Sequence, residues 1–290
     1  AIINKFFSTP PPSIEGIKIT KYFFFISRRK LCFKIIMSIL YIKLTMLISI
    51  IMPYFKKKKY VKYSVLSVLN QTLKNFELII VYDNETSDEL KFINRIKKLD
   101  KRIKVIKNRS NIGVGLSRNV GIDHSKGVYI AFLDADDLWH KNKLFKQIKF
   151  MRKKNIEISH TSYEIIDDDL AIRGTRQAKL MNYKKLIKSC DIGLSTVIIK
   201  KSLIKNLRFP NLKTKEDYVL WLEIAKKGKT IHALNTKLTQ WRKSKNSLSA
   251  SVVRKLTDGY YVYRHHLKFS VIKSLYSLLV LSINFLKKTK

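Results

Sequence analysis

Acidic side chains follow two short apolar segments of this chain, and they are the residues best suited to chemistry. Asp83 comes directly after residues 76–82, and an acidic group at 134–137 comes directly after residues 128–133. Both apolar segments are predicted strands, and ligands bind outside the carboxyl ends of the strands in open α/β sheets. The sequence therefore predicts a ligand site at these two acidic positions.

The second acidic group has the composition of a metal site. Asp134, Asp136 and Asp137 bring three carboxylates within four residues, and such neighbours repel one another unless a cation lies between them. Mg²⁺ and Mn²⁺ take one or two carboxylates and complete their shell with waters and substrate phosphates. Asp136 and Asp134 are the predicted ligands. The alternative is structural, with Asp136 and Asp137 capping a helix that starts near Leu138.

Apolar periodicity from Met46 onwards predicts the elements that must hold these acids. Strands are predicted at residues 47–53, 76–82, 103–107 and 128–133, and helices at 60–69, 89–99 and 114–123. Strands that alternate with helices of this length indicate βαβ units and a largely parallel sheet. The predicted fold class is therefore α/β. Another helix is predicted over residues 215–225, with Glu216 and Asp217 at its N-terminus, where acids interact favourably with the helix dipole.

The charge of the chain is strongly basic. Its 290 residues include 59 Lys and Arg against 21 Asp and Glu, a net charge of +38. Such a charge suggests a nucleic-acid partner, but the lysines are spread evenly and no recognition pattern accompanies them, so no nucleic acid is expected. Two alternatives remain: a solvated surface with general attraction to anions, or a surface for anionic lipid headgroups. Cys32 and Cys190 have neither disulfide nor zinc spacing, which fits a reducing cytoplasm.

The segment from Gly127 to Trp139, GVYIAFLDADDLW, resembles the Asp-x-Asp region of family 2 glycosyltransferases. Further segments resemble that family in the same order, namely Ile48–Pro53, Ser67–Thr72, Phe76–Asp83 and Asn111–Gly121. The resemblance implies a GT-A fold, a Rossmann-like mixed and mostly parallel sheet flanked by helices. It also implies a nucleotide-diphosphate-sugar donor and a Mn²⁺ or Mg²⁺ ion that bridges the diphosphate.

The resemblance also implies roles for individual residues on the donor side. Asp83 would contact the nucleotide base, and Arg118 would lie near the nucleotide. Pro53, at the end of the first matching segment, would belong to the same nucleotide-sugar site. Asp134 would serve the ribose and sugar as well as the metal, and Asp136 the metal. Base contacts are the weaker expectation, because only the second of the family's two acids is kept in the segment Tyr-Asp-Asn-Glu that includes Asp83.

On the acceptor side, the resemblance implies that Asp217 is the general base that deprotonates the acceptor hydroxyl, with Glu216 as its helper or rival. Arg242 begins a match to the closing segment of small bacterial members, in which Ser244 replaces a histidine. Arg242 could reach the diphosphate, although an ordinary salt bridge explains it nearly as well. The Gly113-Val-Gly115 pair is expected to let the chain turn into the helix that carries Arg118.

These features predict three regions. Residues 1–45 form an N-terminal appendage outside the native domain or, alternatively, a membrane-touching arm; residues 46–250 form the catalytic domain. Residues 251–290 form a basic, amphipathic tail that lies at the inner leaflet or docks on its own domain. The expected function is transfer of one sugar, with inversion, to a lipid-linked or growing surface glycan such as O-antigen or capsule. The enzyme would be cytoplasmic and peripheral to the inner face of the membrane. The rival is a degenerate member that binds nucleotide or membrane without turnover.

Overall fold

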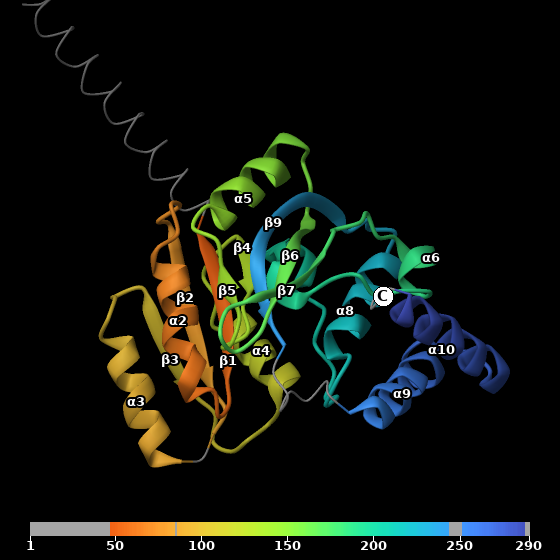
Figure 1. The fold of residues 1–290 in the computed structure, drawn as a ribbon, viewed down its shortest axis with the longest axis horizontal. Helices are drawn as coiled ribbons and strands as arrows, with labels where there is room; N and C mark the ends of the chain where they lie inside the picture. The colour runs from red at the N-terminus through yellow and green to blue at the C-terminus, as the bar shows by residue number, and fades with distance from the viewer. Residues whose placement is uncertain (1–46, 85, 244–250, 288–290) are drawn as a thin grey trace, which may run out of the picture. The chain divides into compact units, whose positions relative to one another are not determined.

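A computed structural model describes residues 47–84, 86–243 and 251–287 (Figure 1). Three sequence-based expectations lie outside these residues. They concern the appendage at 1–45, the closing segment after Lys243 that includes Ser244, and the last three residues of the basic tail.

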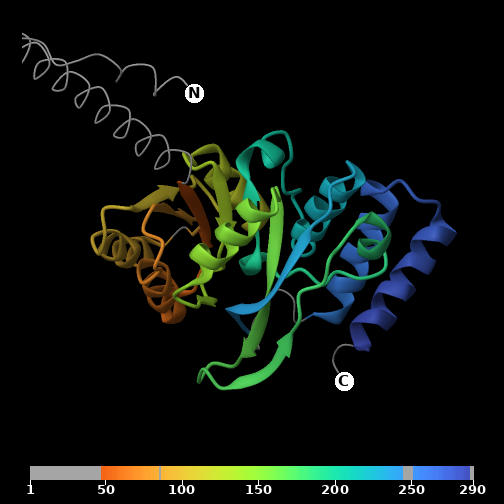
Figure 2. The same cartoon turned by 90° about the horizontal axis from the view of Figure 1, so that it is seen from above.

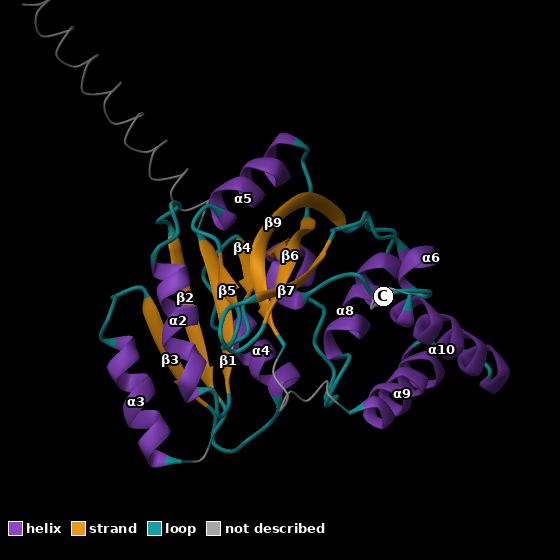
Figure 3. Ribbon diagram, viewed as in Figure 1, coloured by secondary structure: helices purple, strands orange, loops and turns teal. Residues whose placement is uncertain are grey.

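The described residues form one nine-stranded mixed sheet with the order β3-β2-β1-β4-β8-β6-β9-β5 and with β7 paired to β6 (Figure 3). β3, β2, β1 and β4 run parallel to one another, and β8 runs antiparallel to β4. The strands are β1 Ile48–Tyr54, β2 Phe76–Tyr82, β3 Ile103–Lys107, β4 Tyr129–Phe132, β5 Leu138–Trp139, β6 Ile158–Ile166, β7 Ile172–Arg176, β8 Ile198–Lys200 and β9 His232–Arg242.

Helices connect these strands and cover the sheet (Figures 1 and 2). The α-helices are α2 Lys58–Leu69, α3 Ser87–Lys97, α4 Val114–Asp123, α5 Lys143–Lys153, α6 Tyr183–Leu186, α7 Lys201–Ile204, α8 Glu216–Lys226, α9 Val252–Tyr261 and α10 Val271–Leu286. A short 3₁₀ turn spans Leu194–Thr196, and a π-helical turn spans Val262–His266.

The central strands are apolar along their whole length because both of their faces are buried. Every residue of β1 and β2 is buried, as parallel strands covered by helices require. Alternate side chains of β1 enter different cores: Ile50 packs in the core that includes Val65 of α2, whereas Ile51 packs in the core that includes Trp221 of α8. The α/β prediction is confirmed, and β2, β3 and α4 have the predicted bounds.

The capping alternative for the second acidic group is wrong. Residues Leu138–Trp139 form β5, which pairs antiparallel with β9, and the next helix begins only at Lys143. Strand pairing at this point uses the backbone groups that a helix start would need. Asp136 and Asp137 therefore lie in a loop between two strands rather than at a helix N-terminus.

The topology brings the two acidic groups to one edge of the sheet. β1 pairs with β2 on one side and with β4 on the other, and all three run in the same direction. Asp83 follows the last residue of β2, and Asp134 lies two residues after the end of β4. Because the carboxyl ends of parallel strands share an edge, both acids lie at the ligand-binding end of the sheet.

The C-terminal helices dock on the rest of the domain through polar contacts. Asp258 of α9 accepts hydrogen bonds from the backbone and side chain of Thr214, which lies just before α8. Asn284 of α10 donates to the carbonyl of Lys188. Within the described part of the chain, no helix has the length and apolar character needed to cross a membrane.

Candidate active site

The carboxylate of Asp83 holds the loop that precedes α4. It accepts hydrogen bonds of 2.9 Å from the Asn108 side chain and from the backbone N–H groups of Ile112 and Gly113. Asp83 itself is buried. These three hydrogen bonds let the Asp83 carboxylate position the loop that leads into α4, and its contact with a nucleotide base stays a prediction.

Two glycines shape the same region for different reasons. Gly113 has φ +91°, a left-handed conformation that side chains rarely adopt. Gly115, in the first turn of α4, allows a close approach: a Cβ there would lie 2.8 Å from the carbonyl oxygen of Pro210 and 3.2 Å from Cγ of Glu216. The positive φ of Gly113 agrees with the expectation that these glycines let the chain turn into the helix that carries Arg118. Gly115 also lets α8 pack against α4.

Arg118 joins two of the predicted acids. Its guanidinium donates to Asp134 at 2.8 Å and to Glu216 at 2.5 Å, and it lies over the ring of Phe209. The side chain is only 3% exposed. Burial works against the charge of Arg118, but the two carboxylates outweigh it and raise the pKa of the guanidinium. Arg118 is therefore a permanent cation at the centre of the site.

Asp134 and Asp136 are the acids of the loop whose side chains are partly exposed, Asp136 only to 14%. One third of the Asp134 side chain is exposed. Oδ2 of Asp136 accepts a hydrogen bond of 2.6 Å from Nζ of Lys57. Burial raises the pKa of Asp136, and the charge of Asp134 adds to this, whereas Lys57 lowers it. Lys57 thus offsets the charge of Asp136, as Arg118 offsets that of Asp134.

Asp137 has a different role from its two neighbours. It points into the protein, where it accepts hydrogen bonds from Oγ of Ser195 at 2.6 Å and from the backbone N–H of Arg242 at 2.9 Å. Ser195 in turn accepts a hydrogen bond from the backbone N–H of Asp134. Burial, together with the charges of Asp136 and Asp134, raises the pKa of Asp137 well above its usual range. Asp137 therefore anchors the acidic loop to the short turn that contains Ser195.

The donor set suits a metal that shares its shell with a substrate. No group of three potential protein ligands converges among residues 47–84, 86–243 and 251–287. Mg²⁺ and Mn²⁺ need only one or two carboxylates when phosphate and water supply the rest. Asp134 and Asp136 meet this requirement, while Asp137 is committed to Ser195 and Arg242. The residues present therefore fit such an ion bound together with a diphosphate.

Glu216 and Asp217 are adjacent at the start of α8 but differ in their contacts. Glu216 is buried in its ion pair with Arg118. Asp217 accepts a hydrogen bond from the backbone N–H of Tyr218, and no ion pair of Asp217 is found among the described residues. Burial, followed by repulsion from Glu216, raises the pKa of Asp217 to about 7, although Arg118 acts in the opposite direction. A carboxyl group with such a pKa can accept a proton near neutral pH.

The remaining candidates, Arg242 and Pro53, are part of the framework of the site. The Arg242 guanidinium donates to the backbone carbonyls of Asp136 and Asp167 at 3.0 and 2.7 Å and lies over the ring of Tyr60. Arg242 is therefore held by carbonyl groups rather than by a carboxylate. Pro53 is buried next to the last residue of β1.

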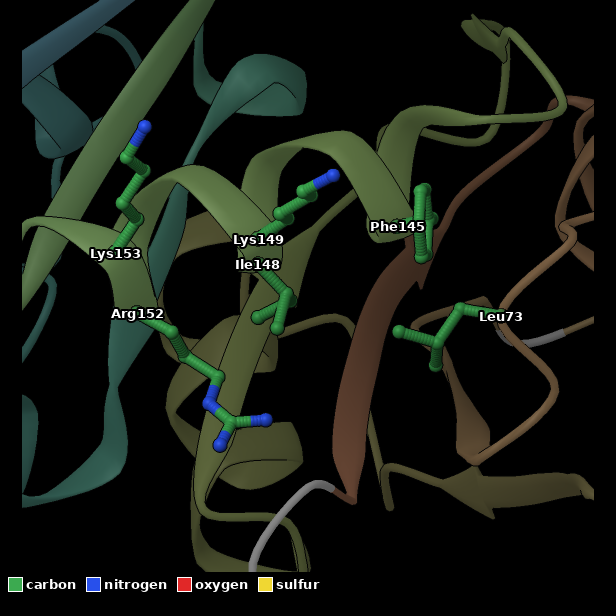
Figure 4. Close-up of a pocket in the computed structure, with 6 residues that line it drawn as sticks. All are labelled: Leu73, Phe145, Ile148, Lys149, Arg152 and Lys153. Atoms are coloured by element: carbon green, nitrogen blue, oxygen red, sulfur yellow. The ribbon is translucent and has the colours of Figure 1, made fainter.

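A separate hollow of about 430 Å³ lies beside α5 (Figure 4). None of the predicted site residues lines it. Its lining residues are Leu73, Phe145, Ile148, Lys149, Arg152 and Lys153. The hollow is thus distinct from the acidic site.

Sequence reasoning missed two residues of the site. Lys57 belongs to a run of four lysines starting at Lys56, which favours a solvated surface, yet it contacts Asp136. Ser195 carries no sequence signal of its own, because it belongs to none of the segments that resemble the family. The position of Lys57, just after the first strand of the sheet, is the one signal that could have singled it out.

Comparison with known proteins agrees with this geometry. A family model described as Glycosyl transferase family 2 matches residues 49–206. The chain is 41% identical over 213 residues to the Escherichia coli UDP-Glc:alpha-D-GlcNAc-diphosphoundecaprenol beta-1,3-glucosyltransferase WfaP, covering 72% of this chain and 82% of WfaP. It is 32% identical over 248 residues to TuaG of Bacillus subtilis, a candidate teichuronic acid biosynthesis glycosyltransferase, covering 83% of this chain and 97% of TuaG.

The fold is also similar to that of a solved glycosyltransferase. The mannosyltransferase PcManGT from Pyrobaculum calidifontis, solved with GDP-Man and Mn²⁺, superimposes with a TM-score of 0.61 at 13% identity. The match covers 80% of this chain and 69% of that structure. The family model, the relatives and the shared fold agree, and the chain therefore belongs to glycosyl transferase family 2, as a glycosyltransferase with a GT-A-like fold.

Proposed function

We propose that this enzyme transfers one sugar from a nucleotide-diphosphate sugar to a hydroxyl group of a lipid-linked glycan, with Asp217 as the general base. One observation carries the proposal: Asp217 has a pKa of about 7 and lies beside Glu216, whose ion pair with Arg118 links it to Asp134. The candidate base Asp217 is thereby connected, through Glu216 and Arg118, to Asp134 of the proposed donor site.

On the donor side, Asp83, Arg118 and Pro53 contribute to the nucleotide-sugar site. Asp134 and Asp136 would hold Mn²⁺ or Mg²⁺ together with the diphosphate. Such an ion, when bound, neutralises the charge that develops on the diphosphate as the sugar departs. Of the two proposed metal ligands, Asp134 pairs with Arg118. This ion pair connects the proposed metal site to helix α4. Arg242 supports the loop of Asp136 through its hydrogen bond to the Asp136 backbone carbonyl.

The chemical step is a single displacement. The acceptor hydroxyl oxygen forms a bond to the anomeric carbon while the bond from that carbon to the diphosphate oxygen breaks, and the electron pair leaves with the diphosphate. The hydroxyl proton passes to the carboxylate of Asp217, which must be ionised beforehand. Attack opposite the leaving group inverts the anomeric configuration. Glu216 holds Arg118 and is not free to act as the base.

The relatives support a particular substrate class. WfaP is named for transfer from UDP-Glc to a GlcNAc-diphosphoundecaprenol, and 41% identity over most of that protein makes the same class of donor and acceptor our proposal here. Because such a polyprenyl-linked glycan is assembled at the membrane, we propose that the enzyme works in the cytoplasm at the inner face of the membrane.

Release of nucleotide from a panel of nucleotide sugars by the full chain tests this function. We expect Mn²⁺-dependent release that EDTA abolishes and that both Asp136→Asn and Asp217→Asn lose. Asp88→Asn, which changes an acid that is 84% exposed on α3, is the matched control and should retain activity. Donor binding without turnover, even with a polyprenyl-linked acceptor present, would instead identify a degenerate binder in which Lys57 replaces the metal.

A further inference from the structure

Helix α10 has an unusual distribution of apolar side chains. The face that packs on the domain contains Ser274, Ser277 and Leu281, which are 0, 6 and 8% exposed. Leu278 packs next to it against the core. Two of the three most buried positions are therefore serines, and the apolar residues of this helix are not used mainly for packing.

The opposite face of α10 is apolar and exposed. Its residues recur at intervals of three, four or seven, so they form one continuous stripe along about 21 Å of helix. The stripe consists of Ile272, Leu275, Tyr276, Leu279, Ile283 and Leu286. Their exposed fractions run from 42 to 82%, with Ile272 the most exposed. A soluble monomer rarely leaves so long an apolar surface open unless something binds there.

Helix α9 adds to this surface. Lys255 lies over the ring of Phe285, which fixes α9 beside the C-terminal half of α10. Val252 and Val253, in the first turn of α9, are 66 and 72% exposed. Both helices lie at the end of the sheet opposite α3 (Figures 1 and 2). The apolar stripe of α10 and the first turn of α9 are called here the α9–α10 face.

The charged residues of α9, α10 and the segment between them are almost all basic. From Ser251 to Lys287, the basic residues are Arg254, Lys255, Arg264, Lys268, Lys273 and Lys287. The only acid in this range, Asp258, is bound to Thr214. An apolar stripe on helices whose charges are almost all basic matches an anionic bilayer, because apolar side chains enter the acyl boundary while lysines remain at the headgroups.

We propose that the α9–α10 face is a docking surface for an anionic lipid bilayer. This inference rests on the proposed function, because a lipid-linked acceptor is presented at such a surface. The contact that attaches α9 to the domain also lies close in sequence to the candidate base: Asp258 accepts hydrogen bonds from Thr214, three residues before Asp217. A bilayer bound to these helices would therefore present its lipid-linked sugars near the loop that starts α8.

Sedimentation of the full chain with vesicles tests the proposal. The vesicles are phosphatidylcholine alone or phosphatidylcholine with phosphatidylglycerol. The stripe variant Leu275→Glu/Leu279→Glu changes two residues that are 54 and 58% exposed. The matched control Leu99→Glu/Phe145→Glu adds the same two charges at residues that are 49 and 51% exposed, after α3 and on α5. Thermal unfolding checks that each variant is folded.

We expect the native chain and the control variant to bind the anionic vesicles, and this binding to weaken as NaCl is raised. The stripe variant should bind about tenfold less or weaker still. Equal binding of the two variants, or no vesicle binding by the native chain, would overturn the proposal. So would a native dimer in lipid-free solution that the stripe variant converts to a monomer, because a second copy would then cover the face. Nucleotide release without vesicles reports on the proposed function separately and should be the same in all three proteins.

Discussion

Arg118 donates a hydrogen bond of 2.5 Å to Glu216, and this buried pair joins the helix behind the donor site to the helix that carries the candidate base. The same guanidinium reaches Asp134 at 2.8 Å. One cation thus fixes the spacing between the loop of Asp134 and the start of α8, which carries Asp217. The proposed donor and acceptor sides of the site are therefore linked through Arg118.

Removal of the Glu216 carboxylate should destabilise the protein. Glu216→Ala leaves the buried Arg118 with one partner, and breaking a buried ion pair costs about 3 kcal/mol. Glu216→Gln keeps an oxygen acceptor and should cost less. Urea unfolding measures both, with Glu223→Ala on the same helix as the control. A loss in Glu216→Ala no greater than in the control would contradict a structural role for the pair.

The pH dependence of the reaction should identify the base. Because Asp217 must be ionised and its pKa is about 7, kcat/KM should fall as the pH drops through about 7. Glu216 raises the pKa of Asp217, so Glu216→Gln should move this fall to lower pH. Above that pKa, Asp217→Asn should lower kcat by about 10²- to 10⁴-fold, and the difference should shrink as Asp217 of the native enzyme becomes protonated. If Asp217→Asn kept the same acid limb with nearly full activity, Asp217 would not be the base.

Lys57 should compete with the divalent cation for Asp136. Its ammonium lies 2.6 Å from the carboxylate, and both side chains are partly exposed. Lys57→Gln should therefore tighten Mn²⁺ binding about threefold in the absence of nucleotide, as expected for loss of a partly exposed ion pair. Titration followed by electron paramagnetic resonance measures this. Lys62→Gln removes one positive charge from α2 and serves as the control. Equal effects of the two changes would show that Lys57 acts only through its general positive charge and not through its ion pair with Asp136.

Ser195 should stabilise the acidic loop. Ser195→Ala leaves the buried Asp137 without its side-chain donor and Asp134 N–H without its acceptor. The free energy of unfolding should fall by about 1–3 kcal/mol, and kcat should fall because the loop of Asp134 and Asp136 loses its anchor. Thr257→Ala, on the exposed side of α9, is the control. Unchanged kcat in a destabilised Ser195→Ala would confine the role of Ser195 to folding.

The periodic parts of the fold were predictable from the sequence. Strand β2 and helix α4 have the predicted bounds because local apolar patterns specify them. The family and the α/β class are confirmed as well, since they rest on several segments in order. The position of Asp83 and Asp134 at one sheet edge followed from the rule for parallel strands.

Contacts between distant residues were not predictable in this way. Lys57 and Asp136 are 79 positions apart, and Ser195 and Asp137 are 58 apart. No local pattern links such pairs. From the sequence alone, Asp137 was therefore grouped with the predicted metal ligands, and Lys57 was expected on the solvated surface. The capping prediction failed for a related reason: β5 forms only because β9, a hundred residues later, pairs with it.

The sheet is parallel from β3 to β4 and changes direction at β8, which joins β4 through three residue pairs. Asp83 and Asp134 follow strands of the parallel half, whereas the β6–β7 hairpin and α6 belong to the other half. In the described sheet, β6 and β7 pair with none of β1, β2 and β4, so insertions in that hairpin would leave the pairing of those three strands in place. The parallel half that carries Asp83 and Asp134 can therefore keep its geometry while the sequence of the other half diverges.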